Sequence, residues 1–133
     1  MTELFADTSF FVSFLNPADT HHDSAAYYMN EFAERIICTE FILAELGNYL
    51  SATNARQLFV PFVREIRSDT RFEILPADER MIDSGLVEYE RVRDKKWSFT
   101  DCTSFVVMRR RKITESLTAD RHFQQAGFVA LFK

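Results

Sequence analysis

Leu4-Phe5-Ala6-Asp7-Thr8-Ser9-Phe10-Phe11 is the stretch that decides the fold, because a short apolar run ends in it at a carboxylate followed by two hydroxyls. The run up to Asp7 predicts a buried strand, and the pattern over 8–15 predicts a helix stopped by Asn16-Pro17. In an open α/β sheet, ligands bind outside the carboxyl ends of the strands. Asp7 therefore either faces a functional crevice or simply caps the following helix, as Asp often does.

Short apolar segments alternate with helical patterns along the rest of the chain, which is typical of a parallel sheet covered on both faces. We expect further strands at 36–38, 72–75, 113–118 and 128–131, and helices at about 19–35, 40–52, 55–68, 78–93, 101–110 and 120–125. Pro61 predicts a kink or break near 59–60. No repeat or linker is visible, so we predict one α/β domain over 1–133, with a central parallel sheet of four or five strands flanked by helices.

The composition excludes several classes of protein. The 133 residues are 47% apolar and include 14 phenylalanines, so the chain can build a core and is not disordered. No apolar segment reaches the about 18 residues of a membrane span, and no signal peptide is visible. Cys38 and Cys102 lack a CxxC partner spacing and predict reduced, buried thiols in a cytoplasmic protein.

A net charge of −4 argues against a general polyanion binder, but basic residues are clustered. Arg91, Arg93, Lys95 and Lys96 precede Asp101, and a second cluster fills 109–112. These residues either bind RNA or complement helix dipoles at helix ends, and the sequence leaves both readings open.

Three further acids are expected at the end of the sheet that carries Asp7. Glu45 borders the apolar face of its helix, where a carboxylate needs a partner, either a cation site or an arginine. Asp101 begins a helix that Ser98 or Thr100 could cap, and Asp120 follows a strand as Asp7 does. Carboxylates this close repel one another unless a cation is bound, and oxygen ligands suit Mg²⁺ or Mn²⁺.

No histidine or cysteine is expected among the ligands, which favours these hard cations over zinc. His21 and His22 are adjacent and point in different directions on a helix. His122 lies beside Asp120 and either contacts the substrate or, as we expect, is a surface or structural residue. A phosphodiester-cleaving site would then use Asp7 and Asp101 as principal ligands, with Glu45 and Asp120 binding a second ion, orienting water or acting as base.

The chain resembles the PIN-domain ribonucleases, in particular the VapC toxins of type II toxin–antitoxin pairs. The resemblance lies in four segments that occur in the family's order and spacing: Phe5-Ala6-Asp7-Thr8-Ser9, Thr39-Glu40-Phe41-Ile42-Leu43-Ala44-Glu45-Leu46, Ser98-Phe99-Thr100-Asp101-Cys102-Thr103-Ser104-Phe105 and Leu117-Thr118-Ala119-Asp120-Arg121-His122-Phe123. It implies a metal-dependent endoribonuclease whose four acidic positions fall on Asp7, Glu45, Asp101 and Asp120, supported by the hydroxyls of Thr8 and Thr118.

The same resemblance implies an RNA substrate, a small antitoxin partner and a homodimer. Many relatives carry a further acid where Thr103, Ser104 or Arg121 stands here, so the resemblance leaves open whether one or two metals bind.

The aromatic residues of the early helices predict either an exposed protein interface or a Phe-rich core: Phe10, Phe11, Phe14, Tyr28, Phe32, Phe59 and Phe62. The alternatives in function are an RNA-processing nuclease outside a toxin–antitoxin system, a binding-only domain, and a phosphoacceptor receiver, which would need an acidic pair after the first strand.

Overall fold

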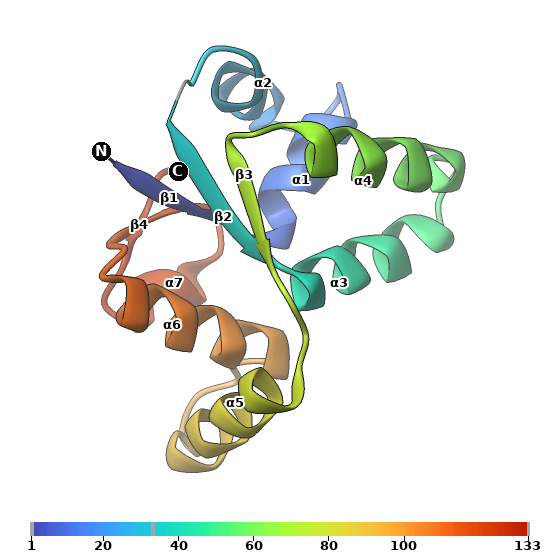
Figure 1. Cartoon of the computed structure of the whole chain (residues 1–133). Coiled ribbons are helices and arrows are strands. Elements are labelled where there is room, and N and C mark those ends of the chain that lie inside the picture. Colours follow the sequence, from blue (N-terminus) through green and yellow to red (C-terminus); the bar gives the residue numbers. More distant parts are fainter. Residues whose placement is uncertain (1, 33, 133) are drawn as a thin grey trace.

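A five-stranded parallel sheet forms the centre of the molecule in the computed structural model, which describes residues 2–32 and 34–132. Its strands are β1 (Glu3–Ala6), β2 (Arg35–Thr39), β3 (Phe72–Leu75), β4 (Glu115–Leu117) and β5 (Val129–Ala130). They lie in the order β3-β2-β1-β4-β5, so the first strand is the central one (Figure 1). The predicted fold class is confirmed, and Asp7 follows the strand at which the winding direction reverses.

Seven α-helices are present in the described residues: α1 (Thr8–Leu15), α2 (His22–Asn30), α3 (Glu40–Ser51), α4 (Phe59–Ser68), α5 (Glu79–Arg91), α6 (Phe99–Arg111) and α7 (Arg121–Gln125). Helices α1, α2 and α4 lie on one side of the sheet and α6 and α7 on the other (Figure 1). Both faces of the sheet are therefore covered, as near-continuous apolar strands require.

Several element boundaries differ from the prediction: α2 ends at Asn30 instead of near Arg35, and polar side chains set where α2 and α6 begin. Helix α2 begins at His22 because Oδ1 of Asp19 accepts the Ser13 hydroxyl (2.9 Å) and the His21 amide (2.8 Å) instead of opening the helix. The predicted break near Pro61 falls between a 3₁₀ turn at Arg56–Leu58 and α4, which places Pro61 in a first helical turn, where proline is tolerated. Helix α6 begins at Phe99, earlier than expected, because Ser98 is its N-cap.

Phenylalanines fill the core instead of an exposed interface. Phe10 and Phe11 are fully buried, Phe62 is buried, and the other early aromatics (Phe14, Tyr28, Phe32 and Phe59) are half-buried and pack against the core. The prediction of an aromatic interface on these residues is therefore wrong. The large apolar side chains that are exposed lie elsewhere: Tyr27, Tyr49, Leu58, Val60, Ile82, Leu86, Val87, Tyr89 and Val129.

Helices α5 and α6 approach closely at Gly85. A Cβ atom on Gly85 would lie 2.6 Å from Cγ2 of Thr103 on α6, nearer than two carbon atoms can pack. The buried carboxylate of Glu88 on α5 also accepts a hydrogen bond from Arg109 of α6 (2.8 Å). This packing fixes α6, whose first turn carries Asp101. None of the helices described is long and apolar enough to span a membrane.

Candidate active site

A cavity of about 510 Å³ lies beyond the carboxyl ends of the strands and is lined by all four predicted acids. Asp7 follows β1, Glu45 lies on α3, Asp101 is in the first turn of α6, and Asp120 stands between β4 and α7. The cavity is also lined by Thr8, Ser9, Val12, Ser13, Asp19, His21, Tyr49, Lys96, Ser98, Ala119 and His122. The structure thus brings together acids that lie far apart in the sequence.

Asp7 occupies the N-cap position of α1, but its side chain makes no capping hydrogen bond. Its Oδ2 atom instead accepts hydroxyl hydrogen bonds from Thr118 (2.8 Å) and Ser9 (3.1 Å). Burial raises the pKa of Asp7 to about 7, and the negative charges of Asp101 and Glu45 act in the same direction, while the Thr118 hydrogen bond opposes them. A simple capping role does not describe this carboxyl group.

Glu45 accepts a hydrogen bond from the Thr8 hydroxyl. The ion pairs found among the described residues include none with Glu45, so the arginine partner considered as an alternative is not seen there. Thr8 contacts Glu45 and Thr118 contacts Asp7, so each lies where its hydroxyl can support the acidic site, as the resemblance implies.

Asp101 and Asp120 are held by hydrogen bonds at the starts of two helices. Asp101 is buried, and its Oδ2 atom accepts the Ser98 amide (3.1 Å) while Ser98 caps α6, which makes a reciprocal capping box. Ser98 is therefore the cap, as one of the two alternatives in the sequence analysis has it, and Asp101 adds the reciprocal hydrogen bond. Asp120 caps α7 by accepting the His122 amide at Oδ1 (2.9 Å). Burial raises the pKa of Asp101, against the opposing hydrogen bonds of His122 and Ser98.

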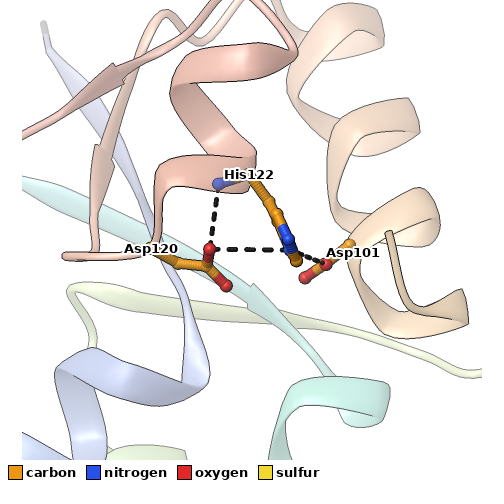
Figure 2. A group of neighbouring side chains, drawn as sticks. All are labelled: Asp101, Asp120 and His122. Atoms are coloured by element: carbon orange, nitrogen blue, oxygen red, sulfur yellow. Dashed lines mark hydrogen bonds and ion pairs between the residues drawn. The ribbon is translucent and has the colours of Figure 1, made fainter. Parts of the chain in front are cut away.

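His122 lies between these two acids (Figure 2). Its Nδ1 atom is 3.0 Å from Oδ2 of Asp101 and 3.5 Å from Oδ1 of Asp120. The expectation that no histidine lies at ligand distance from the acids is therefore wrong. The sequence offered one signal for His122, its position two residues after Asp120 at the start of a short helix. Its contact with Asp101 joins two segments that lie apart in the sequence, so the position of His122 did not reveal it.

Sequence reasoning also missed two residues that contact or face the acids. Ser9, two residues after Asp7, has its hydroxyl 3.1 Å from both Oδ2 of Asp7 and Oγ1 of Thr118. Asp19 lines the cavity from the loop before α2, and nothing in the spacing of the chain distinguishes it from an ordinary turn residue.

The predicted basic cluster divides into residues near the cavity and residues used in packing. Lys96 lines the acidic cavity. Arg93, Lys95 and Lys96, together with Tyr89 and Trp97, line a neighbouring cavity of about 660 Å³ that shares Lys96 and Ser98 with the acidic one. Arg91 instead forms an ion pair with the buried Glu88 (3.0 Å).

Two residues of the second basic cluster, Arg109 and Arg111, form structural ion pairs. Arg109 contacts Glu88 at 2.8 Å, and Arg111 contacts Glu3 at 2.9 Å and Glu73 at 2.8 Å, at the start of β1 and within β3. These residues therefore bind parts of their own fold.

The donor set of the cavity fits a divalent cation. Two of the four carboxylates, Asp7 and Asp101, are buried, and burial together with the repulsion of neighbouring acids raises the pKa values of both. A cation would relieve this repulsion, and carboxylate oxygens are the ligands that Mg²⁺ and Mn²⁺ prefer. Asp101, Asp120 and His122 place one potential ligand atom each within 4.8 Å of the others.

Comparison with known proteins gives the same picture. The model of the PIN domain family matches residues 4–129. The 23S rRNA-specific endonuclease VapC20 of Mycobacterium tuberculosis, found in two strains, is 30% identical over 129 residues, which is 95% of this chain and 95% of that protein.

Solved structures share the fold along the whole chain. The crystal structure of M. tuberculosis VapC20, described as a sarcin–ricin loop cleaving toxin, superimposes with a TM-score of 0.85 at 25% identity, over 96% of this chain and 98% of that one. FitAcB from Neisseria gonorrhoeae gives 0.67 at 16% identity (98% and 96% covered). VapBC2 from Rickettsia felis, bound to promoter DNA, gives 0.65 at 12% identity (97% of each chain covered). At the identities of these last two, the likeness concerns the fold alone.

Proposed function

This chain belongs to the PIN domain family, and from that premise we propose that it is a metal-dependent endoribonuclease and the toxin of a toxin–antitoxin pair. The observation that carries the proposal is the convergence of Asp7, Glu45, Asp101 and Asp120 on one cavity beyond the carboxyl ends of the strands. An open α/β sheet binds ligands at this edge. The buried Asp7 makes no capping hydrogen bond, and like charges brought together at this edge cost stability, so folding alone does not explain its position.

The acids take different roles in the proposed reaction. Asp7 and Asp101, the two buried ones, are the principal ligands, and Glu45 and Asp120 complete the metal site by binding a cation, orienting the attacking water or accepting its proton. The hydroxyls of Thr8, Ser9 and Thr118 hold the carboxylates of Glu45 and Asp7 in place. When bound, Mg²⁺ or Mn²⁺ supplies positive charge to the phosphodiester and lowers the pKa of water.

The basic cavity next to the acids supports binding of an RNA backbone. Lys96 belongs to both cavities and so lies where a strand would pass from one to the other. Arg93 and Lys95 extend the positive charge beyond it. We propose that these three residues contact phosphates, and that Arg91, which pairs with Glu88, contributes less than the sequence suggested.

The relatives support the choice of substrate and partners. VapC20 is named for cleavage of 23S rRNA and is described as cutting the sarcin–ricin loop, so we propose a structured ribosomal RNA loop as the substrate class. VapC20 is also described as a toxin, which supports a small antitoxin as the partner of this chain. Exposed Ile82, Leu86 and Val87 on α5 would suit a homodimer contact.

The proposed place of action is the cytoplasm. Cys38 and Cys102 are free and buried, as suits a protein acting there.

Cleavage of defined RNA tests the proposal. The purified chain is incubated with a 23S rRNA fragment that contains the sarcin–ricin loop, and with the same fragment carrying a scrambled loop, in Mg²⁺, in Mn²⁺ and in excess EDTA. We expect a single metal-dependent cut in the native loop, absent in EDTA and in Asp101→Asn. Cleavage that persists in EDTA would overturn the metal mechanism, and cleavage equal in Asp101→Asn would overturn the site.

The toxin role has a separate test. Induced expression of the wild-type chain should arrest bacterial growth, and Asp101→Asn at equal expression should not. Arrest by both proteins would show that growth inhibition does not come from the proposed active site.

A further inference from the structure

His122 is the one imidazole that contacts the acids of the cavity in the part of the chain described here (Figure 2). We infer that its Nδ1 atom is a nitrogen ligand of the cation site, and that this site therefore prefers Mn²⁺ to Mg²⁺. The inference rests on the proposed function only for the presence of a divalent cation at these acids. It assigns a ligand and a metal preference that the acidic quartet alone does not predict.

The distances around His122 match those between neighbouring ligands of one cation. In an octahedral site with bonds of about 2.1 Å, adjacent ligand atoms are about 3.0 Å apart. Nδ1 of His122 lies 3.0 Å from Oδ2 of Asp101 and 3.5 Å from Oδ1 of Asp120. A cation that lies between Nδ1 of His122 and these two carboxylate oxygens can therefore contact all three side chains with little movement of the protein.

The side chain of His122 is held at this place from several directions. Its own backbone amide donates to Oδ1 of Asp120 (2.9 Å), and the next residue, Phe123, is fully buried. Asp101, on the other side, is fixed by the capping box with Ser98. The side chain of His122 is 24% exposed, so the site stays open to an entering cation.

Nitrogen ligation changes which cation is preferred. Carboxylate and water oxygens suit Mg²⁺, whereas imidazole suits transition metals, and Mg²⁺ gives up its water ligands reluctantly. A site made only of Asp7, Glu45, Asp101 and Asp120 would accept Mg²⁺ and Mn²⁺ with a modest difference. Adding Nδ1 of His122 raises the affinity for Mn²⁺ more than that for Mg²⁺.

Calorimetric titration of the RNA-free protein measures the preference. Mn²⁺ and Mg²⁺ are titrated into the wild type, His122→Asn, His122→Phe and His21→Asn. His21 is a matched control, because it also lines the cavity but its side chain makes no hydrogen bond or ion pair with Asp7, Glu45, Asp101 or Asp120 in the described structure. We expect both His122 variants to lower the ratio of Mn²⁺ to Mg²⁺ affinity by about tenfold, and His21→Asn to leave it unchanged. An unchanged ratio in both His122 variants overturns the metal preference.

Pulsed electron paramagnetic resonance of bound Mn²⁺ tests ligation directly. A ¹⁴N coupling from imidazole should be present in the wild type and in His21→Asn and absent in both His122 variants, whose folding is checked by thermal melts. Absence of the coupling in the wild type overturns the assignment and leaves His122 as a hydrogen-bond donor to Asp101. These measurements contain no RNA, so a protein that shows the coupling but cleaves no RNA would refute the proposed function and leave the ligand assignment intact.

Discussion

The Thr118 hydroxyl donates a hydrogen bond of 2.8 Å to Oδ2 of Asp7, so the residue after β4 orients the residue after β1. The two strands pair in parallel, with Ala6 beside Leu117, which brings their ends together. The same hydroxyl oxygen accepts the Asp120 amide at 3.0 Å. A single threonine therefore links two of the four acids and sets their relative position.

Thr118→Val should weaken divalent-cation binding because it removes this link while keeping the size of the side chain. Removal of an outer partner of a ligand commonly costs about 10–100-fold in metal affinity. Calorimetric titration with Mn²⁺ measures the change. Thr118→Ser is the control, since it keeps a hydroxyl and should retain most of the affinity. Equal affinities for Thr118→Val and the wild type would show that Asp7 needs no orientation by Thr118.

Asp7→Asn should abolish RNA cleavage and yet raise the melting temperature of the metal-free protein. The substitution keeps the shape of the side chain and removes one buried charge, whose repulsion with a neighbouring acid costs about 1–2 kcal/mol after partial relief by the raised pKa. Saturating Mg²⁺ should stabilise the wild type by mass action and the variant much less. Thermal melts with and without Mg²⁺, together with one cleavage assay, measure all three effects.

Asp78→Asn is the matched control for that experiment. Asp78 caps α5 by accepting the Met81 amide (2.9 Å), is exposed, and does not line the acidic cavity. Asn caps about as well as Asp, so cleavage and stabilisation by Mg²⁺ should both be unchanged. If Asp7→Asn behaves like Asp78→Asn, Asp7 is a capping residue and not a catalytic ligand.

The metal-free protein should lose stability as the pH rises from about 4 to about 7. The pKa of Asp7 is raised from 3.8 to about 7 in the folded state by burial, so across this window the native protein holds a proton that the unfolded chain has released. The unfolding free energy then falls with rising pH, by at most about 1.4 kcal/mol per unit for one such group. Urea denaturation in EDTA at several pH values should show this slope in the wild type and a flatter one in Asp7→Asn. Identical slopes would contradict the raised pKa.

Gly85→Ala should destabilise the protein by about 1–3 kcal/mol, the usual cost of forcing extra volume into a packed contact. Alanine favours a helix, so the loss would come from contact with Thr103 (2.6 Å to Cγ2) and Phe99 (3.0 Å to Cζ). Asp83→Ala, on the exposed side of α5, is the control and should not destabilise. Urea denaturation measures both variants, and equal stabilities would mean that α6 shifts to accommodate the methyl group.

The strands and most helices could be predicted because the periodicity of apolar residues reports directly which face of an element is buried. The sequence also predicted that Asp7 and Asp120 line one site, because the carboxyl ends of parallel strands lie at the same edge of the sheet. The start of α2 could not be predicted, because Asp19 could cap a helix or bind Ser13, and only the folded loop decides. The contact of His122 with the acids was missed because its partner Asp101 lies on a different element. The sequence left open whether Phe11 lies in the core or at an interface, because an apolar pattern does not show what covers a side chain.

Lys96→Gln should weaken RNA binding and lower its dependence on salt, whereas Arg91→Gln should mainly lower stability. Lys96 lines both cavities, so its loss should remove about one phosphate contact and reduce the slope of log affinity against log salt by about 0.7–0.9. Arg91 pairs with Glu88, which is 6% exposed, so Arg91→Gln weakens that pairing without altering the path proposed for RNA. Filter binding in EDTA at several salt concentrations, beside thermal melts, measures both effects. If the two variants change the salt slope equally, the basic residues act as a general positive field, and Lys96 holds no special position beside the acids.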